Sequence, residues 1–191
     1  CISHWNKFMR NFIKKFKINR GKPDASLIYQ AIVRQSREVQ FYTKCGVPDT
    51  PTGRFELISL HSFVFMKRLK VLGGEAEALS QALFDYMFAD IDINLREMGV
   101  GDIGVGKKIK SLAAAYYGRI KSYETALKKG ESAIKESLTR NLYCDEKPTE
   151  RQLSAMTVYI LALSEVTNKL NLQQISAVDF IFPLPLDEKA G

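Results

Sequence analysis

The stretch TGRFELISLHSFVFMKRLKVL, residues 52–72, decides the class of fold. Its apolar residues surround most of the helical circumference instead of forming one stripe; they are Phe55, Ile58, Leu60, Phe63, Val64, Phe65, Met66 and Leu69. A helix that is apolar on most sides is buried among other elements. The pattern therefore predicts a helix at the centre of a bundle.

Helical periodicity continues on both sides of this segment. Apolar spacing and Gly, Pro and Asn breakers predict further helices over about 26–45, 75–98, 102–129 and 131–142, and a last long helix that opens at Thr149. No strand pattern or internal repeat is evident. We expect an all-α, single-domain multi-helix bundle over residues 23–178. A basic amphipathic helical arm over residues 1–22 precedes this domain, and a proline-containing extended tail over residues 179–191 follows it.

The composition is typical of a soluble globular protein, with 46% hydrophobic and 26% charged residues. Charged residues interrupt every apolar stretch before it reaches the roughly 20 residues of a membrane span. The three cysteines and two histidines are widely spaced and include no C-x-x-C pair. We therefore expect reduced thiols and no zinc site.

The net charge of the chain lies in its first 22 residues. This arm contains seven of the 28 Lys and Arg residues and none of the 21 Asp and Glu residues. The rest of the chain is therefore neutral, although the whole chain has a formal charge of +7. A DNA-binding body is not indicated, because its basic residues would be distributed over the folded surface.

The arm is predicted to form an amphipathic helix. Trp5, Phe8 and Phe12 share one face of this helix, and Lys14 and Lys15 lie elsewhere on the helical wheel. Such a helix can lie on an anionic membrane surface, dock on a partner protein, or fold back on its own core. The sequence leaves these three interpretations open.

A glycine-rich turn follows the helix predicted over residues 75–98. Gly99-x-Gly101-x-x-Gly104 matches a dinucleotide-binding fingerprint, and the segment from Gly101 to Lys107 approaches the P-loop pattern. Both motifs need a strand that leads into the turn, whereas the residues before Gly99 continue a helix. We interpret the turn as a corner between two helices, the second capped by Asp102, and predict no nucleotide cofactor. The alternative that Lys107 and Lys108 hold an anion or a partner carboxylate at the N-terminus of the second helix stays open.

A calcium-loop pattern near this turn is incomplete. Asp90-x-Asp92-x-Asn94 imitates the start of an EF-hand loop, but Leu95 replaces the required glycine and Gly101 the required glutamate. No metal is predicted here.

Two charged pairs are predicted between the helices over 52–72 and 75–98, which Gly73-Gly74 would join as a hairpin. Counting outward from the link places Arg54 level with Asp92 and His61 level with Asp85. Each pair would lie in an apolar seam, and buried ion pairs are more often structural than catalytic. A His–Asp pair is nevertheless half of a nucleophilic site, so an enzyme using this face is one alternative function.

Several ordered blocks between residues 47 and 142 resemble the ubiquinol–cytochrome c chaperone family. They are VPDTPTGRF (47–55), LH (60–61), LFDxxFxDxD (83–92), LREMGVGD (95–102), VGK (105–107) and YGR (117–119). The resemblance fades before Pro23 and after about Tyr143.

The resemblance implies a helical protein without catalytic activity or cofactor. Members of the family help newly made cytochrome b to enter complex III, together with a small partner protein. The matching blocks point to structural or partner-binding roles for Arg54, His61, Asp85, Asp92, Arg96, Gly99, Gly101, Asp102, Lys107 and Arg119.

The expected location follows from the same resemblance. The short chain looks like a bacterial member, which would lie in the cytoplasm, peripheral to the inner membrane. The matrix face of the mitochondrial inner membrane is the alternative. A lipid- or anion-binding helical protein is the other alternative function.

Overall fold

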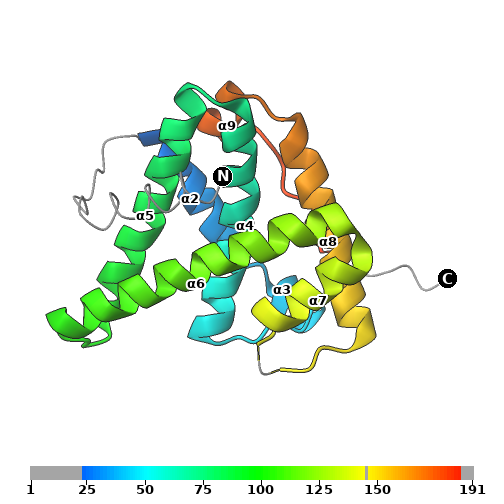
Figure 1. Cartoon of the computed structure of the whole chain (residues 1–191), viewed down its shortest axis with the longest axis horizontal. Coiled ribbons are helices and arrows are strands. Elements are labelled where there is room, and N and C mark those ends of the chain that lie inside the picture. The colour runs from blue at the N-terminus through cyan, green and yellow to red at the C-terminus, as the bar shows by residue number, and fades with distance from the viewer. Residues whose placement is uncertain (1–22, 145, 186–191) are drawn as a thin grey trace.

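The structure, a computed structural model, describes residues 23–144 and 146–185, and these ranges contain helices and no strand. The helices are α2 (Pro23–Ser36), α3 (Val39–Thr43), α4 (Pro51–Leu72), α5 (Glu75–Glu97), α6 (Asp102–Lys129), α7 (Glu131–Asn141), α8 (Glu150–Lys169) and α9 (Leu172–Ala177) (Figure 1). The all-α class is confirmed. The arm over residues 1–22 lies outside the described residues.

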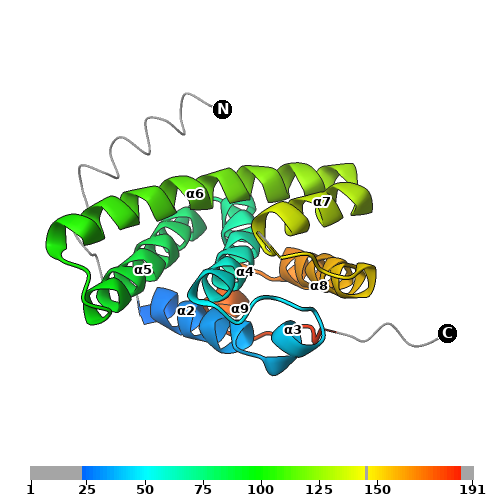
Figure 2. The same cartoon turned by 90° about the horizontal axis from the view of Figure 1, so that it is seen from below.

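The helices form three layers, with α4 at the centre. Figure 2 shows α5, α4 and α8 in the middle layer, α6 and α7 on one side, and α2, α3 and α9 on the other. α4 packs against α2, α5 and α8. Both faces of α4 are therefore covered, as the distribution of its apolar residues predicts. Twelve of its residues are buried.

Residues at the start of α4 stabilise its first turn. The Thr50 hydroxyl caps the helix by accepting a hydrogen bond from the Gly53 backbone N–H at 3.1 Å, and Pro51 occupies the first turn. An added Cβ at Gly53 would lie 2.0 Å from the Pro48 carbonyl oxygen. Only glycine therefore allows the preceding loop to lie this close to the helix.

We expect Gly53→Ala to destabilise the protein by about 1–3 kcal/mol, because the loop must move to make room for the methyl group. Gly118→Ala is the matched control, since Gly118 lies inside α6 and a Cβ there would meet nothing within 4 Å. The control substitution should stabilise the protein by up to about 1 kcal/mol through helix propensity. Urea denaturation measures both changes, and equal effects at the two sites would contradict the close-approach explanation.

The predicted helix over residues 26–45 is wrong as a single element. The structure has α2 and then the short α3, separated by Arg37 and Glu38. The Tyr42 hydroxyl donates to the Ser36 carbonyl at 2.7 Å, so the break is stabilised by a side chain. The apolar spacing continues across the break and therefore conceals it.

The last described residues pack on the core. Phe180 and Phe182 lie against Phe65 of α4, with ring centroids 4.9 and 5.7 Å away. The Gln35 amide of α2 donates to the Pro183 carbonyl at 3.2 Å. We call residues 180–183 the C-terminal strap, because this segment contacts both α2 and α4.

Candidate functional site

His61 is completely buried in a polar network between α2, α4 and α8. Its Nδ1 donates to the Leu57 carbonyl at 2.7 Å, and its Nε2 accepts from the Tyr159 hydroxyl at 2.6 Å. The Gln35 amide in turn donates to the Tyr159 hydroxyl, and the Ser36 hydroxyl lies 3.2 Å from His61 Nδ1. Burial lowers the pKa of His61 to about 4. The imidazole is therefore neutral, has both nitrogens occupied, and offers no access to a substrate.

The two predicted pairs between α4 and α5 are wrong. Arg54 is exposed and forms an ion pair with Asp49 at 2.8 Å. Asp92 pairs with Arg96 at 2.6 Å on its own helix. Asp85 accepts a hydrogen bond from Gln81 at 2.8 Å, and its partial burial raises its pKa.

The reason is the rotation of the helices about their axes. The chain does reverse at Gly73-Gly74, and α4 and α5 do pack together. Counting from the link gives the height of a residue along its helix but not the direction of its side chain. His61 faces α2 and α8, whereas Asp85 lies on the side of α5 near Tyr117 of α6. The predicted enzyme face therefore does not exist.

A buried ion pair joins α4 to α6 instead. The Arg119 guanidinium donates to both carboxylate oxygens of Glu56 and lies over the Phe55 ring, 6.0 Å from its centroid. Glu56 is 1% exposed, and the Arg119 side chain 19%. Burial raises the pKa of Glu56 to about 7, although Arg119 acts in the opposite direction.

The sequence analysis named Arg119 but missed its partner. Glu56 is the only acidic residue in segment 52–72, where it lies among apolar residues. A single carboxylate in a helix buried on most sides needs a cationic partner. This isolated acid was therefore a signal in the sequence for a buried ion pair.

The glycine-rich turn is confirmed as a corner between two helices. The predicted Asp102 cap is wrong, because Gly101 is the N-cap of α6 and the Asp102 side chain pairs with Arg96 instead. Gly99 has φ +81°, in the left-handed region that favours glycine, and Gly101 precedes the first residue of α6. Arg96 forms ion pairs with Asp92 on α5 and with Asp102 on α6, and thereby bridges the corner. Lys107 lies exposed farther along α6. The corner thus brings together the predicted residues Asp92, Arg96, Gly99, Gly101 and Asp102.

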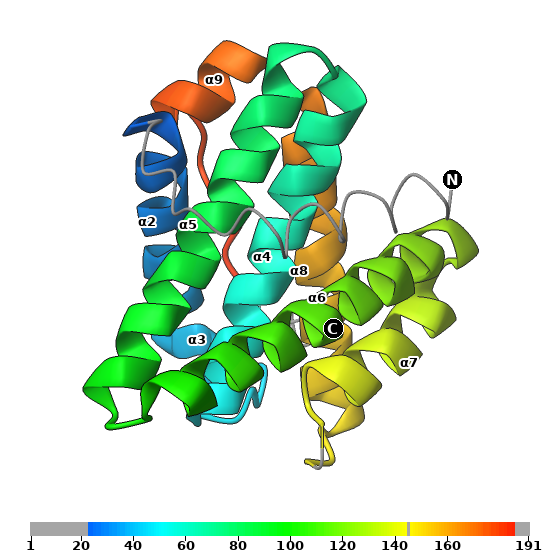
Figure 3. The same ribbon diagram turned by 60° about the vertical axis from the view of Figure 1, so that its left-hand side comes forward.

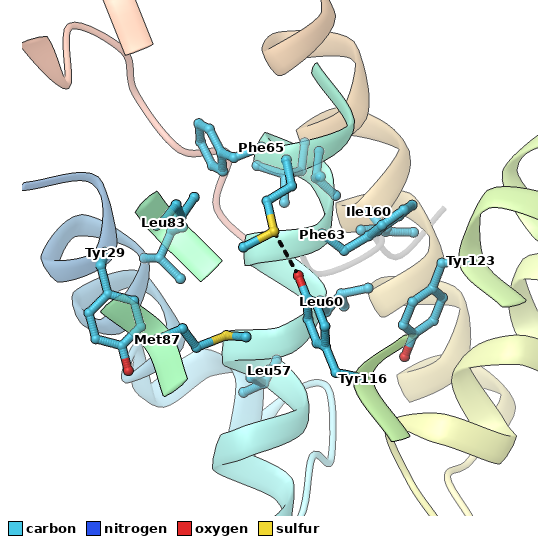
Figure 4. Packing of buried hydrophobic residues seen from close by; sticks show 14 of the residues in the cluster. Tyr29, Leu57, Leu60, Phe63, Phe65, Leu83, Met87, Tyr116, Tyr123 and Ile160 are labelled. Atoms are coloured by element: carbon cyan, nitrogen blue, oxygen red, sulfur yellow. Dashed lines mark hydrogen bonds between the residues drawn. The ribbon is translucent and has the colours of Figure 1, made fainter. Parts of the chain in front are cut away.

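An apolar cleft of about 450 Å³ lies between α4, α5 and α6. Its apolar lining consists of Phe63, Met66, Phe84, Tyr116, Tyr117 and Ile120. Figure 4 shows Tyr116 reaching from α6 towards α4, where its hydroxyl donates to the Met66 sulfur at 3.1 Å. Exposed Ala78 and Lys70 are also among the lining residues, so the cleft opens to solvent. We call it the α4–α6 cleft.

Sequence reasoning did not find the cleft, because its lining comes from three helices whose apolar residues all look like core. None of the predicted site residues in the described part of the chain is among its lining residues. The predicted residues Trp5, Phe8, Phe12, Lys14 and Lys15 lie outside the described residues. Within residues 23–144 and 146–185, no group of His, Cys, Asp and Glu could hold a metal.

Comparison with known proteins identifies the family of this chain. A model of the ubiquinol-cytochrome C chaperone family matches residues 43–182. The chain therefore belongs to this family, and the match extends well beyond Tyr143, after which the blocks of resemblance in the sequence end.

Related proteins extend the similarity to most of the chain. Ubiquinol-cytochrome-c reductase complex assembly factor 1 of Xenopus laevis is 22% identical over 180 residues, which cover 93% of this chain and 90% of the frog protein. The Mus musculus protein is also 22% identical over 92% of this chain, but only 58% of its own length is covered. A crystal structure of the Cbp3 homolog from Brucella abortus is 33% identical with a TM-score of 0.76, covering 93% of this chain and 97% of the other.

Proposed function

We propose that this protein is a non-enzymatic chaperone for assembly of the cytochrome bc1 complex (complex III). The observation that supports this most strongly is the match of nearly the whole chain to proteins named as assembly factors of that complex. The geometry of the α4–α6 cleft agrees, because an open apolar cleft suits an apolar segment of a client protein better than a reaction centre.

The proposed client is newly made cytochrome b, which is held at the membrane surface with the help of a small partner protein. None of the described helices has the length and apolarity needed to span a bilayer. Contact with the membrane would therefore be made by the client and by the basic arm over residues 1–22.

A crosslinking pull-down from native membranes tests this function. We expect cytochrome b to be enriched with the tagged protein relative to an unrelated integral membrane protein of the same membranes. Cells that lack the protein should contain less assembled complex III, and the wild-type gene should restore it. Unchanged complex III together with no enrichment of cytochrome b would contradict the proposal. Lipid recovered in place of cytochrome b would favour the lipid-binding alternative.

A further inference from the structure

We propose that the α4–α6 cleft is the docking site of the chain's own N-terminal arm, with the apolar face of residues 5–17 inserted between α4, α5 and α6. This inference concerns the isolated chain and does not depend on the client. It begins with the cleft itself, whose lining combines the buried rings of Phe63, Phe84 and Tyr116 with half-buried Tyr117 and Ile120 and exposed Ala78. An apolar groove of this kind is typical of a surface that binds an amphipathic helix.

The arm has the matching chemistry. Its predicted helix presents Trp5, Phe8 and Phe12 on one face, together with Met9, Ile13 and Phe16. These residues follow the i, i+3, i+4 spacing with which a helix anchors itself in an apolar groove. The opposite face is basic and would remain in water.

The charges at the mouth of the cleft allow this orientation. The residues that line the cleft include Glu77 on α5, Glu124 on α6, and Lys67 and Lys70 on α4. A basic helix is therefore accommodated along the walls formed by α5 and α6. Its lysines would meet the two glutamates there, at a distance from the lysines of α4.

The connection between the arm and the domain is long enough. α2 and α6 lie on opposite sides of α5 (Figure 2), so the chain must cross one helix to reach the cleft. Residues 18–22 can span roughly 17 Å when extended, and a helix with its side chains is about 10–12 Å wide. Figure 3 shows α2 beginning next to α9 and running alongside α5, which contributes Glu77, Gln81 and Phe84 to the cleft.

Tethering makes the arm a strong competitor for the cleft. A short flexible link gives an attached segment an effective concentration in the mM range, far above that of a free partner. The apolar face of the arm that would dock in the cleft is the same face that would lie on a membrane. The arm can therefore occupy the cleft or a membrane surface, but not both at once.

Trp5 makes the inference directly testable, since it is the only tryptophan of the chain. In the purified full-length protein without lipid, we expect Trp5 to emit at short wavelength and to be protected from acrylamide. Ala78→Arg places a bulky cation on an exposed position of the cleft wall. It should shift the emission to longer wavelength and raise quenching several-fold. Ala114→Arg, at an exposed position of α6 outside the cleft, is the matched control and should change neither.

Three outcomes would overturn the inference. A solvent-exposed Trp5 in the wild type would show that the arm is not docked, and protection that survives Ala78→Arg would place it elsewhere. Protection that disappears on dilution would assign the cleft to the arm of a second copy. Circular dichroism melting checks that the variants fold, and Ser80→Arg, on the same wall, replaces Ala78→Arg if that variant does not.

Discussion

Arg119→Met should lower the free energy of unfolding by about 3–5 kcal/mol at pH 8, because it leaves the Glu56 carboxylate buried without its cationic partner. Glu56 is 1% exposed and cannot reach water without opening the contact between α4 and α6. Glu56→Gln should cost less, since the Arg119 side chain is 19% exposed and can turn its charge towards solvent.

The loss of stability caused by Arg119→Met should depend on pH. Burial raises the pKa of folded Glu56 to about 7, above its ordinary value of 4.5. The contribution of this group to stability is therefore fully present below pH 4.5 and is lost as the pH rises through 7. Near pH 5 the folded carboxyl is protonated with or without Arg119, so Arg119→Met should cost much less there than at pH 8. Urea denaturation at the two pH values measures the difference.

A double variant separates a structural role from a functional one. Glu56→Leu combined with Arg119→Met removes both desolvation penalties and should recover much of the lost stability. Lys169→Met is the control, because Lys169 and Glu165 form an ion pair whose side chains are 73% and 71% exposed. It should change stability by no more than about 0.5 kcal/mol. An equal penalty in this exposed pair would contradict the importance of burial.

Deletion of residues 1–20 should abolish binding to anionic vesicles. The arm holds the whole net charge of the chain, and its aromatic residues are of the kind that lie at the lipid headgroups. Each basic residue near an anionic surface contributes about 1 kcal/mol, so Lys14→Gln with Lys15→Gln should weaken binding without abolishing it. Cosedimentation with anionic and with neutral vesicles measures both effects.

The melting behaviour of the shortened chain is the control. A cooperative transition should remain, because the described residues alone form a core cluster that unites α2 with α4, α5, α6, α7, α8 and α9. Unchanged vesicle binding after the deletion would refute a membrane role for the arm. Complete loss of the folding transition would show instead that the domain cannot form without it.

The positions of the longest helices could be predicted from the sequence. Glycines mark the ends of α4, α5 and α6, and apolar periodicity marks their interiors, so the predicted bounds differ from the observed ones by at most one residue. These signals are local, which is why one sequence suffices to find them. The central position of α4 followed from its apolar circumference.

Contacts between helices could not be predicted in the same way. The pairs Arg54–Asp92 and His61–Asp85 failed because the rotation of two packed helices depends on the whole core, not on the link between them. The same limit concealed the cleft, whose walls come from three helices. The Glu56–Arg119 pair joins residues 63 positions apart, although the isolated acid in α4 gave a usable signal.

The C-terminal strap has a consequence for how the protein is made. The hydrogen bond between Gln35 of α2 and Pro183 of the strap joins residues that are 148 positions apart. α2 therefore leaves the ribosome roughly ten to thirty seconds before the strap is synthesised. The network around His61 also awaits Tyr159 and Phe182, and is completed only late in translation. The basic arm emerges before α2. During synthesis the arm is therefore available to an anionic surface before α8 and the C-terminal strap, which complete the fold, have been made.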